Sequence, residues 1–233
     1  MVEPGVAFPT FERTRLVDDV TARLRSMIID GTLEPGTTLL QIELAEKLGV
    51  SRTPLREAFR ILEYEGFVRV TNGNKTLEVV ELTNDDIVEL YQFREVIDGL
   101  AARLAAKRGI SDADYEMLSG RIDEMHSYDP SAPRDGAARA AAHAAFHVRI
   151  VELSRNRLVI NQAPMVRLTS QMLARRIAEL GTEEPAVTAN LLSEGEVDHR
   201  AVLEAIRRGG ASDAETIARR HIRRTMRSEL VRR

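Results

Sequence analysis

The chain has 233 residues, of which 43% are hydrophobic and 30% charged, with a formal net charge of −3. It has no cysteine, which excludes disulfide scaffolds, thiolate zinc fingers, cysteine-held iron–sulfur clusters and cysteine nucleophiles. Its length and apolar content exclude a disordered tail. Any metal must therefore be held by His, Asp or Glu, and any basic surface must be local.

The N-terminal residues lack the basic-then-apolar layout of a signal peptide, and no run of about 18 uncharged apolar residues follows. We therefore expect a cytoplasmic protein without a membrane partner. Residues 1–13 carry two prolines and little periodicity, so we expect a flexible arm there.

Helical periodicity predicts a first helix over 14–30, and a second short helix is predicted over 41–49, ending at Gly49. After a three-residue connection a third helix is predicted, with Ser51 or Thr53 as its cap, and runs to Gly66. Two segments rich in Val and Thr then flank a polar tip and predict a β-hairpin over 67–71 and 76–82. Residues 14–82 thus read as a winged helix-turn-helix of three helices plus a hairpin.

The rest of the chain, 83–233, has the sequence pattern of amphipathic helices and no strand-like stretch. We expect an all-α bundle of about six helices, and so a mainly α protein, with helices over 83–109, 111–127, 138–154, 157–180, 191–210 and 211–233. Pro164 is expected to kink the fourth of these, and 130–136 and 181–187 are expected to be connections.

Arginines stripe one face of the third predicted helix. Arg52, Arg56 and Arg60 are spaced by four, beside Ser51 and Thr53. The opposite face is apolar and would seat the helix on its neighbours. Such a helix suits a DNA major groove, where arginine reads guanine and hydroxyl groups contact phosphate. The alternative is a solvated basic stripe, and the surrounding helix-turn-helix and hairpin favour DNA.

Four histidines are predicted to meet around one ion. His143 and His147 are one turn apart on one helix. His199 and His221 lie ten residues before and eleven after the Gly209-Gly210 turn, so in an antiparallel pair each stands about 15 Å from it. Imidazoles from three helices suit zinc first, with nickel or another divalent transition metal as alternatives.

The alternative for each of these histidines is an ordinary polar side chain on a helix, and we keep that interpretation for His126, which lies near a helix end without a partner in the sequence.

The stretch 44–66, LAEKLGVSRTPLREAFRILEYEG, resembles the winged helix-turn-helix of GntR-type bacterial transcription regulators. The resemblance implies that Arg52 and Arg56 contact bases or phosphates and Thr53 a phosphate. It also implies that Gly73 and Lys75 lie at the wing tip near the minor groove. The sequence departs from the pattern at Ile42, where a basic residue is common, and at its wing tip.

The helical region is similar to the FCD effector domain of the FadR-like branch, on segments 90–108, 144–156, 198–209 and 218–225. The resemblance implies an effector-binding and dimerisation domain over 83–233, and a homodimer on palindromic half-sites of double-stranded operator DNA. Many such domains bind a divalent metal through one Asp and three His. The match places His147, His199 and His221 on the three histidines and His143 on the Asp.

Four neutral imidazoles would leave both charges of the ion uncompensated, so the cavity should attract an anion. We expect a small organic-acid effector whose carboxylate completes the coordination, with Arg94 as a second, forked partner. The alternative for Arg94 is an i, i+4 ion pair with Asp98.

Together these residues predict a ligand-responsive DNA-binding regulator, a repressor, and not an enzyme. The competing interpretation is a metal-dependent hydrolase, but Ala144 follows His143 where a His-Glu-x-x-His motif would have its base. A helical interaction protein without a ligand is a third interpretation.

Overall fold

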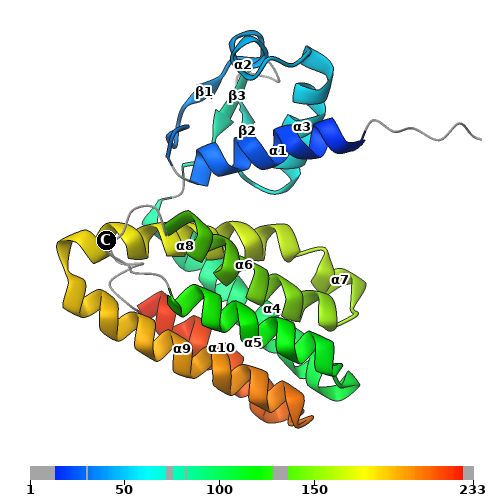
Figure 1. The fold of residues 1–233 in the computed structure, drawn as a ribbon, viewed down its shortest axis with the longest axis vertical. Helices are drawn as coiled ribbons and strands as arrows, with labels where there is room; N and C mark the ends of the chain where they lie inside the picture. Colours follow the sequence, from blue (N-terminus) through cyan, green and yellow to red (C-terminus); the bar gives the residue numbers. More distant parts are fainter. Residues whose placement is uncertain (1–13, 30, 72–75, 82, 128–135, 228–233) are drawn as a thin grey trace, which may run out of the picture. The chain divides into compact units, whose positions relative to one another are not determined.

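The computed structural model describes residues 14–29, 31–71, 76–81, 83–127 and 136–227. The chain forms two compact units, Met1–Val80 and Glu81–Arg233. The described part is mainly helical with one small sheet, which confirms the predicted fold class (Figure 1). The arm expected over 1–13 lies outside the described residues.

The described part of the N-terminal unit has three helices and a three-stranded antiparallel sheet in the order β1-β3-β2. Its elements are α1 (Thr14–Ile29), β1 (Thr38–Leu39), α2 (Gln41–Leu48), α3 (Arg52–Tyr64), β2 (Val68–Thr71) and β3 (Thr76–Val79). The predicted hairpin is β2 with β3, in which Arg69 lies opposite Glu78. Strand β1 was not predicted, because two residues are too short to show a period.

The helix-turn-helix depends on Gly49, which has a left-handed φ of 65° and donates its N–H to the carbonyls of Ala45 and Glu46. This conformation is inexpensive for glycine and lets the chain leave α2 and begin α3 within a few residues. Ser51 is the N-cap residue of α3, but its side chain makes no capping hydrogen bond. The apolar face of α3 is buried at Leu55, Ala58, Phe59 and Leu62.

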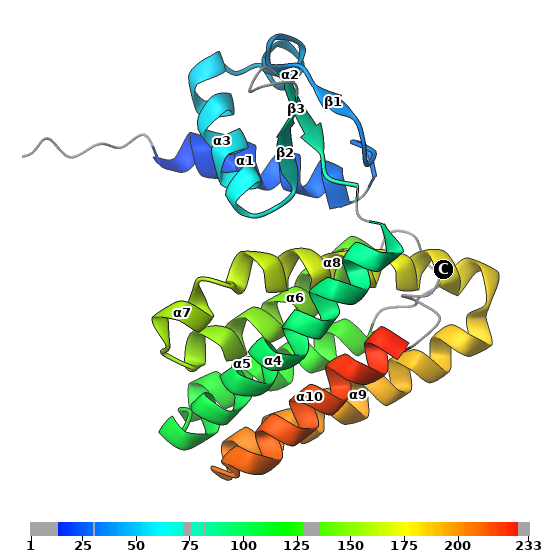
Figure 2. The same ribbon diagram turned by 180° about the vertical axis from the view of Figure 1, so that it is seen from behind.

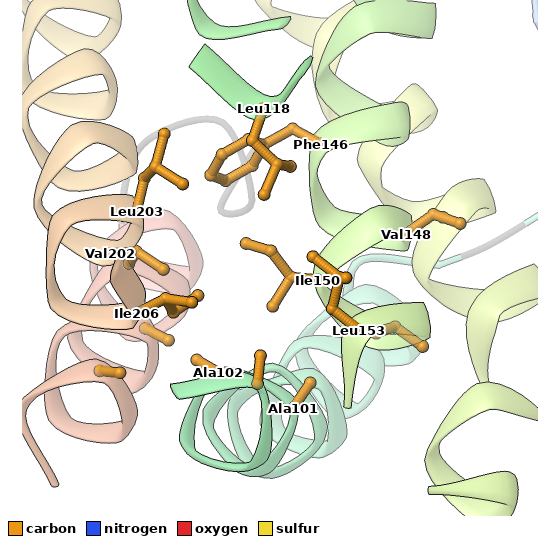
Figure 3. Packing of buried hydrophobic residues seen from close by; sticks show 14 of the residues in the cluster. Ala101, Ala102, Leu118, Phe146, Val148, Ile150, Leu153, Val202, Leu203 and Ile206 are labelled. Atoms are coloured by element: carbon orange, nitrogen blue, oxygen red, sulfur yellow. The ribbon is translucent and has the colours of Figure 1, made fainter. Parts of the chain in front are cut away.

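The described part of the C-terminal unit is entirely helical. It consists of α4 (Asn84–Arg108), α5 (Asp112–Ser127), α6 (Gly136–Leu153), α7 (Arg157–Ile160), α8 (Ala163–Glu183), α9 (Pro185–Arg207) and α10 (Ala211–Arg227). Helix α4 lies along α10, as seen from behind in Figure 2. Figure 3 shows the core where Ala102, Leu118, Phe146 and Ile206 bring α4, α5, α6 and α9 together.

The single kinked helix predicted over 157–180 is wrong. The chain breaks after Ile160, and Pro164 is the second residue of α8. A proline there loses no hydrogen bond, because the first N–H groups of a helix have no partner within it. The connection expected over 181–187 is also shorter, since only Glu184 separates α8 from α9.

Candidate functional site

The three arginines of α3 project into solvent. Arg52, Arg56 and Arg60 are exposed, as are Ser51 and Thr53, while the opposite face of the helix is buried. Since α3 is anchored on one side only, its guanidinium groups and hydroxyls form an outward-facing polar row. This row has the composition that direct contact with bases and phosphates requires.

A groove of about 680 Å³ runs beside this row, lined by α3, the start of α2 and the sheet. Arg52, Arg56 and Arg60 line it, together with Ile42. Glu57 is the nearest acid on α3 and lies 3.2 Å from Arg60 and 3.9 Å from Arg56. The predicted wing-tip residues Gly73 and Lys75 lie outside the described residues.

The four predicted histidines converge inside the helical unit. His143 and His147 come from α6, His199 from α9 and His221 from α10, and one nitrogen from each lies within 4.8 Å of the others. The ring centroids of His199 and His221 are 4.5 Å apart and those of His143 and His147 are 4.8 Å apart. All four rings are buried.

Two of the rings are oriented by acceptors at Nδ1, and a third has a carboxylate nearby. His147 Nδ1 donates to Asp98 Oδ1 at 2.9 Å, and His143 Nδ1 donates to the carbonyl of Ser170 at 3.2 Å. His221 Nδ1 lies 3.5 Å from Asp198 Oδ2. Carboxylates and carbonyls behind an imidazole fix its tautomer and leave Nε2 for an ion, which is the usual outer shell of a metal site.

Several ring nitrogens of the cluster lack partners. Nε2 of His147 and both ring nitrogens of His199 are buried without a hydrogen bond. Leaving such groups unpaired costs free energy, so they call for an ion or a ligand atom. The donor set, four imidazoles without a thiolate, suits zinc, nickel and similar divalent ions.

Three rings of the cluster, those of His143, His147 and His199, are uncharged at neutral pH. Burial lowers the pKa of His147 to about 4 and holds the pKa values of His143 and His199 well below their ordinary value. Burial acts to raise the pKa of Asp98, but the guanidinium of Arg94 and the ring of His147 outweigh it, so this carboxyl stays ionised. Neutral imidazoles are the form that binds a metal.

Arg94 forms the i, i+4 ion pair with Asp98, which was the alternative to binding a ligand carboxylate. Its Nη2 lies 3.0 Å from Asp98 Oδ1 and its Nε 3.2 Å from Asp98 Oδ2, and its side chain is 1% exposed. It is not among the described residues that line the cavity beside the histidines. In this structure the forked carboxylate partner of Arg94 is therefore Asp98, which in turn orients His147.

Two further side chains, which were not predicted to lie there, are close to the cluster. The His126 ring is 6.1 Å from the His199 ring and lines the same cavity, but His126 is not among the four histidines whose nitrogens converge. Arg139 lies on α6 one turn before His143, and both residues line the cavity. The spacing Arg139, His143, His147 was a signal in the sequence, because residues four apart share a helix face.

None of the described helices is long and apolar enough to cross a membrane.

Comparison with known proteins gives two family matches. Residues 16–77 match the gntR family of bacterial regulatory proteins, and residues 89–224, more than half of the chain, match the FCD domain. The HTH-type transcriptional regulator YdhC of Bacillus subtilis is 32% identical over 142 residues, which are 60% of this chain and 61% of that protein.

A probable D-xylose utilization operon transcriptional repressor of Paenarthrobacter nicotinovorans is 29% identical over 90% of this chain and 87% of its own length. The solved structure of Escherichia coli McbR/YncC has a TM-score of 0.67 at 20% identity and covers 91% of this chain and 95% of that one. These relatives are similar to the chain along both units.

Proposed function

The chain belongs to the gntR family of bacterial regulatory proteins and carries an FCD domain, and from this premise we propose that it is a repressor controlled by a metal-dependent organic-acid ligand. The family and the relatives named above are transcriptional regulators, so the alternative of a metal-dependent hydrolase is set aside. The observation that carries the proposal is the buried set of four histidines with unpartnered ring nitrogens.

Operator recognition is assigned to the exposed face of α3. Arg52 and Arg56 would contact bases or adjacent phosphates, Arg60 a phosphate further along, and the hydroxyls of Ser51 and Thr53 the phosphates at the helix start. The exposure of all five side chains supports this role. Gly73 and Lys75 would approach the minor groove from the wing tip.

A dimer would place two such helices on two half-sites. One winged module covers few base pairs, and a twofold pair reads a palindrome with a fixed half-site spacing. A ligand that favours one spacing of the modules over another changes operator affinity, because it shifts the population of the two states.

The metal is assigned to His143, His147, His199 and His221. A bound divalent ion would supply a concentrated positive charge and an open coordination position for an anion. The chain's own residues prepare this position: Asp98 and Ser170 hold the rings of His147 and His143 by hydrogen bonds, and burial keeps these two rings neutral. Because His143 stands where many FCD domains have Asp, no carboxylate in the ligand set offsets the charge of the ion.

Metal analysis of the purified protein tests the first half of the proposal. We expect about one divalent ion per chain, lost in His147→Ala and in His199→Ala. Arg121→Ala, a half-exposed residue of α5, is the matched control and should keep the ion. Wild-type protein that takes up no divalent ion from a zinc or nickel solution would contradict the assignment.

Titration calorimetry of small carboxylates, with and without a chelator, tests the second half. Binding should disappear when the ion is removed, and binding that is unaffected by the chelator would exclude coordination. DNA enriched from a random library by the purified protein should be palindromic and should be released or retained according to the acid present. A non-palindromic product would contradict the dimer.

A further inference from the structure

Arg139 is a buried cation that has no counterion in the part of the chain that the structure describes. Its side chain is 6% exposed, and its Nε has no hydrogen-bond partner among these residues. Among the described residues no carboxylate forms an ion pair with it, whereas Arg94, the other buried arginine of this unit, is paired with Asp98. Burial alone lowers the pKa of Arg139 to about 10, so the guanidinium remains charged.

An unpaired buried charge is costly. Taking an ion out of water costs several kcal/mol unless an opposite charge or a full set of hydrogen bonds replaces the water. Arg139 therefore lowers the stability of the free protein, which is typical of a residue kept for a ligand.

The cavity that Arg139 lines is also lined by three histidines of the cluster. It has a volume of about 50 Å³, several times the roughly 10–15 Å³ that one water requires. Its lining includes His143, His199 and His221 together with apolar side chains of α8 and α9, namely Leu173, Ile177, Leu191 and Leu192. A ligand here would have a short apolar body between polar ends.

The two described acids that line this cavity, Glu194 and Asp198, already lie close to arginines. Asp198 lies 3.3 Å from Arg224 and 3.4 Å from Arg220, and Glu194 lies 3.6 Å from Arg224. A divalent ion on four neutral imidazoles would contribute two positive charges and Arg139 a third. A ligand in the cavity would therefore have to neutralise about three positive charges.

We propose that Arg139 binds one carboxylate of a small dicarboxylate effector, whose other carboxylate faces the ion held by the four histidines. This proposal rests on the proposed function and specifies its ligand. The guanidinium forms forked hydrogen bonds with a carboxylate, and one turn of α6 separates it from His143. A monocarboxylate would satisfy only one of the two positive centres.

The test compares acids of equal length on the metal-loaded protein by titration calorimetry. Malonate is paired with propionate and succinate with butyrate, and inorganic phosphate is included as a second anion class. At least one dicarboxylate should bind about ten- to a hundredfold more tightly than its monocarboxylate partner, as charge-assisted hydrogen bonds to a buried cation predict. Equal affinity within both pairs, or phosphate as the tightest ligand, would overturn the proposal.

The variant Arg139→Gln separates this inference from the proposed function. It should abolish the advantage of the dicarboxylate and leave metal content and monocarboxylate affinity unchanged, while Arg121→Gln should behave as wild type. A dicarboxylate affinity that is unchanged in Arg139→Gln refutes the role of Arg139 alone. Wild-type protein that holds metal but binds no acid refutes the proposed effector function and this inference with it.

A thermal measurement distinguishes a ligand-binding role from a structural one. Arg139→Met replaces an unpaired buried charge by a shorter, unbranched apolar side chain, so it should melt at a higher temperature than wild type in the absence of acids. It should also lose the increase in melting temperature that the best dicarboxylate gives the wild-type protein. A lower melting temperature would show that Arg139 supports the fold and would overturn the proposal.

Discussion

The two units hold their arginines in opposite surroundings. Arg52, Arg56 and Arg60 project from α3 into solvent, whereas Arg94 and Arg139 are 1% and 6% exposed. A cation in water costs little and acts on a polyanion through the sum of many salt-sensitive contacts. A buried cation costs free energy until one specific partner meets it. The exposed arginines of α3 thus suit an extended polyanion. Of the two buried arginines, Arg94 is paired with an acid of the chain, and Arg139 suits a small anionic ligand.

The largest expected effect comes from removing the acid that Arg94 already has. Asp98→Ala leaves a guanidinium buried and unpaired and removes the acceptor of His147, so we expect the free energy of unfolding to fall by about 3–5 kcal/mol. Urea denaturation measures this. Asp123→Ala, which breaks an exposed pair with Arg200, is the control and should change stability by less than about 1 kcal/mol. Equal losses of unfolding free energy in the two variants would show that the buried ion pair matters no more than the exposed one.

The next effect is acid destabilisation of the metal-free protein. The pKa of His147 is about 4 in the folded protein and 6.5 ordinarily, because burial disfavours the charged ring. Between these values the unfolded chain binds a proton that the folded protein does not. Stability should therefore hold above pH 6.5 and fall toward pH 4 by on the order of 3 kcal/mol for this ring. Urea denaturation between pH 7.5 and 4.5 that gives a constant free energy would contradict the shift.

A smaller effect is expected on the exposed row. Arg52→Ala and Arg56→Ala should each weaken operator binding by about 1–3 kcal/mol without changing the melting temperature. Fluorescence anisotropy of labelled operator DNA at several salt concentrations should also show a shallower salt dependence for a lost phosphate contact. Arg121→Ala should match wild type in both assays. A loss of melting temperature together with affinity would mean that these arginines are structural.

The smallest effect concerns the acid beside that row. Glu57 lies within 4.0 Å of Arg56 and Arg60 on a solvent-exposed face. Glu57→Gln should raise operator affinity by roughly two- to fivefold, since surface ion pairs are worth less than about 1 kcal/mol and the substitution removes a charge that repels phosphate. The same anisotropy assay measures it. Weaker binding in Glu57→Gln would show that the pair positions the arginines.

Local signals made the N-terminal unit predictable. Gly49 ends α2, Ser51 is the N-cap residue of α3, and two short segments rich in Val and Thr form the hairpin, so each element is encoded within a few residues. The approach of His199 to His221 was also predictable, because the turn at Gly209-Gly210 sets the level of both on an antiparallel pair. Their rings lie 4.5 Å apart.

Tertiary packing decided what the sequence left open. Whether Arg94 is held by Asp98 or by a ligand depends on which side of α4 faces the cavity, and periodicity alone does not fix this. His126 comes close to His199 only because α5 packs against α9. A charged residue such as Arg139 is expected at the surface from the sequence alone, and it is buried because α6 packs against α8. Long-range contacts of this kind leave no local pattern.

Helix α4 has a mechanical consequence. It begins at Asn84 behind the capping box of Thr83 and Asp86, a few residues after the N-terminal unit ends, and it carries Asp98 against His147. A helix of 25 residues is about 37 Å long and twists little, because each turn is hydrogen-bonded to the next. One continuous hydrogen-bonded helix therefore runs from Thr83, just after the N-terminal unit, past Asp98, the residue that holds the His147 ring.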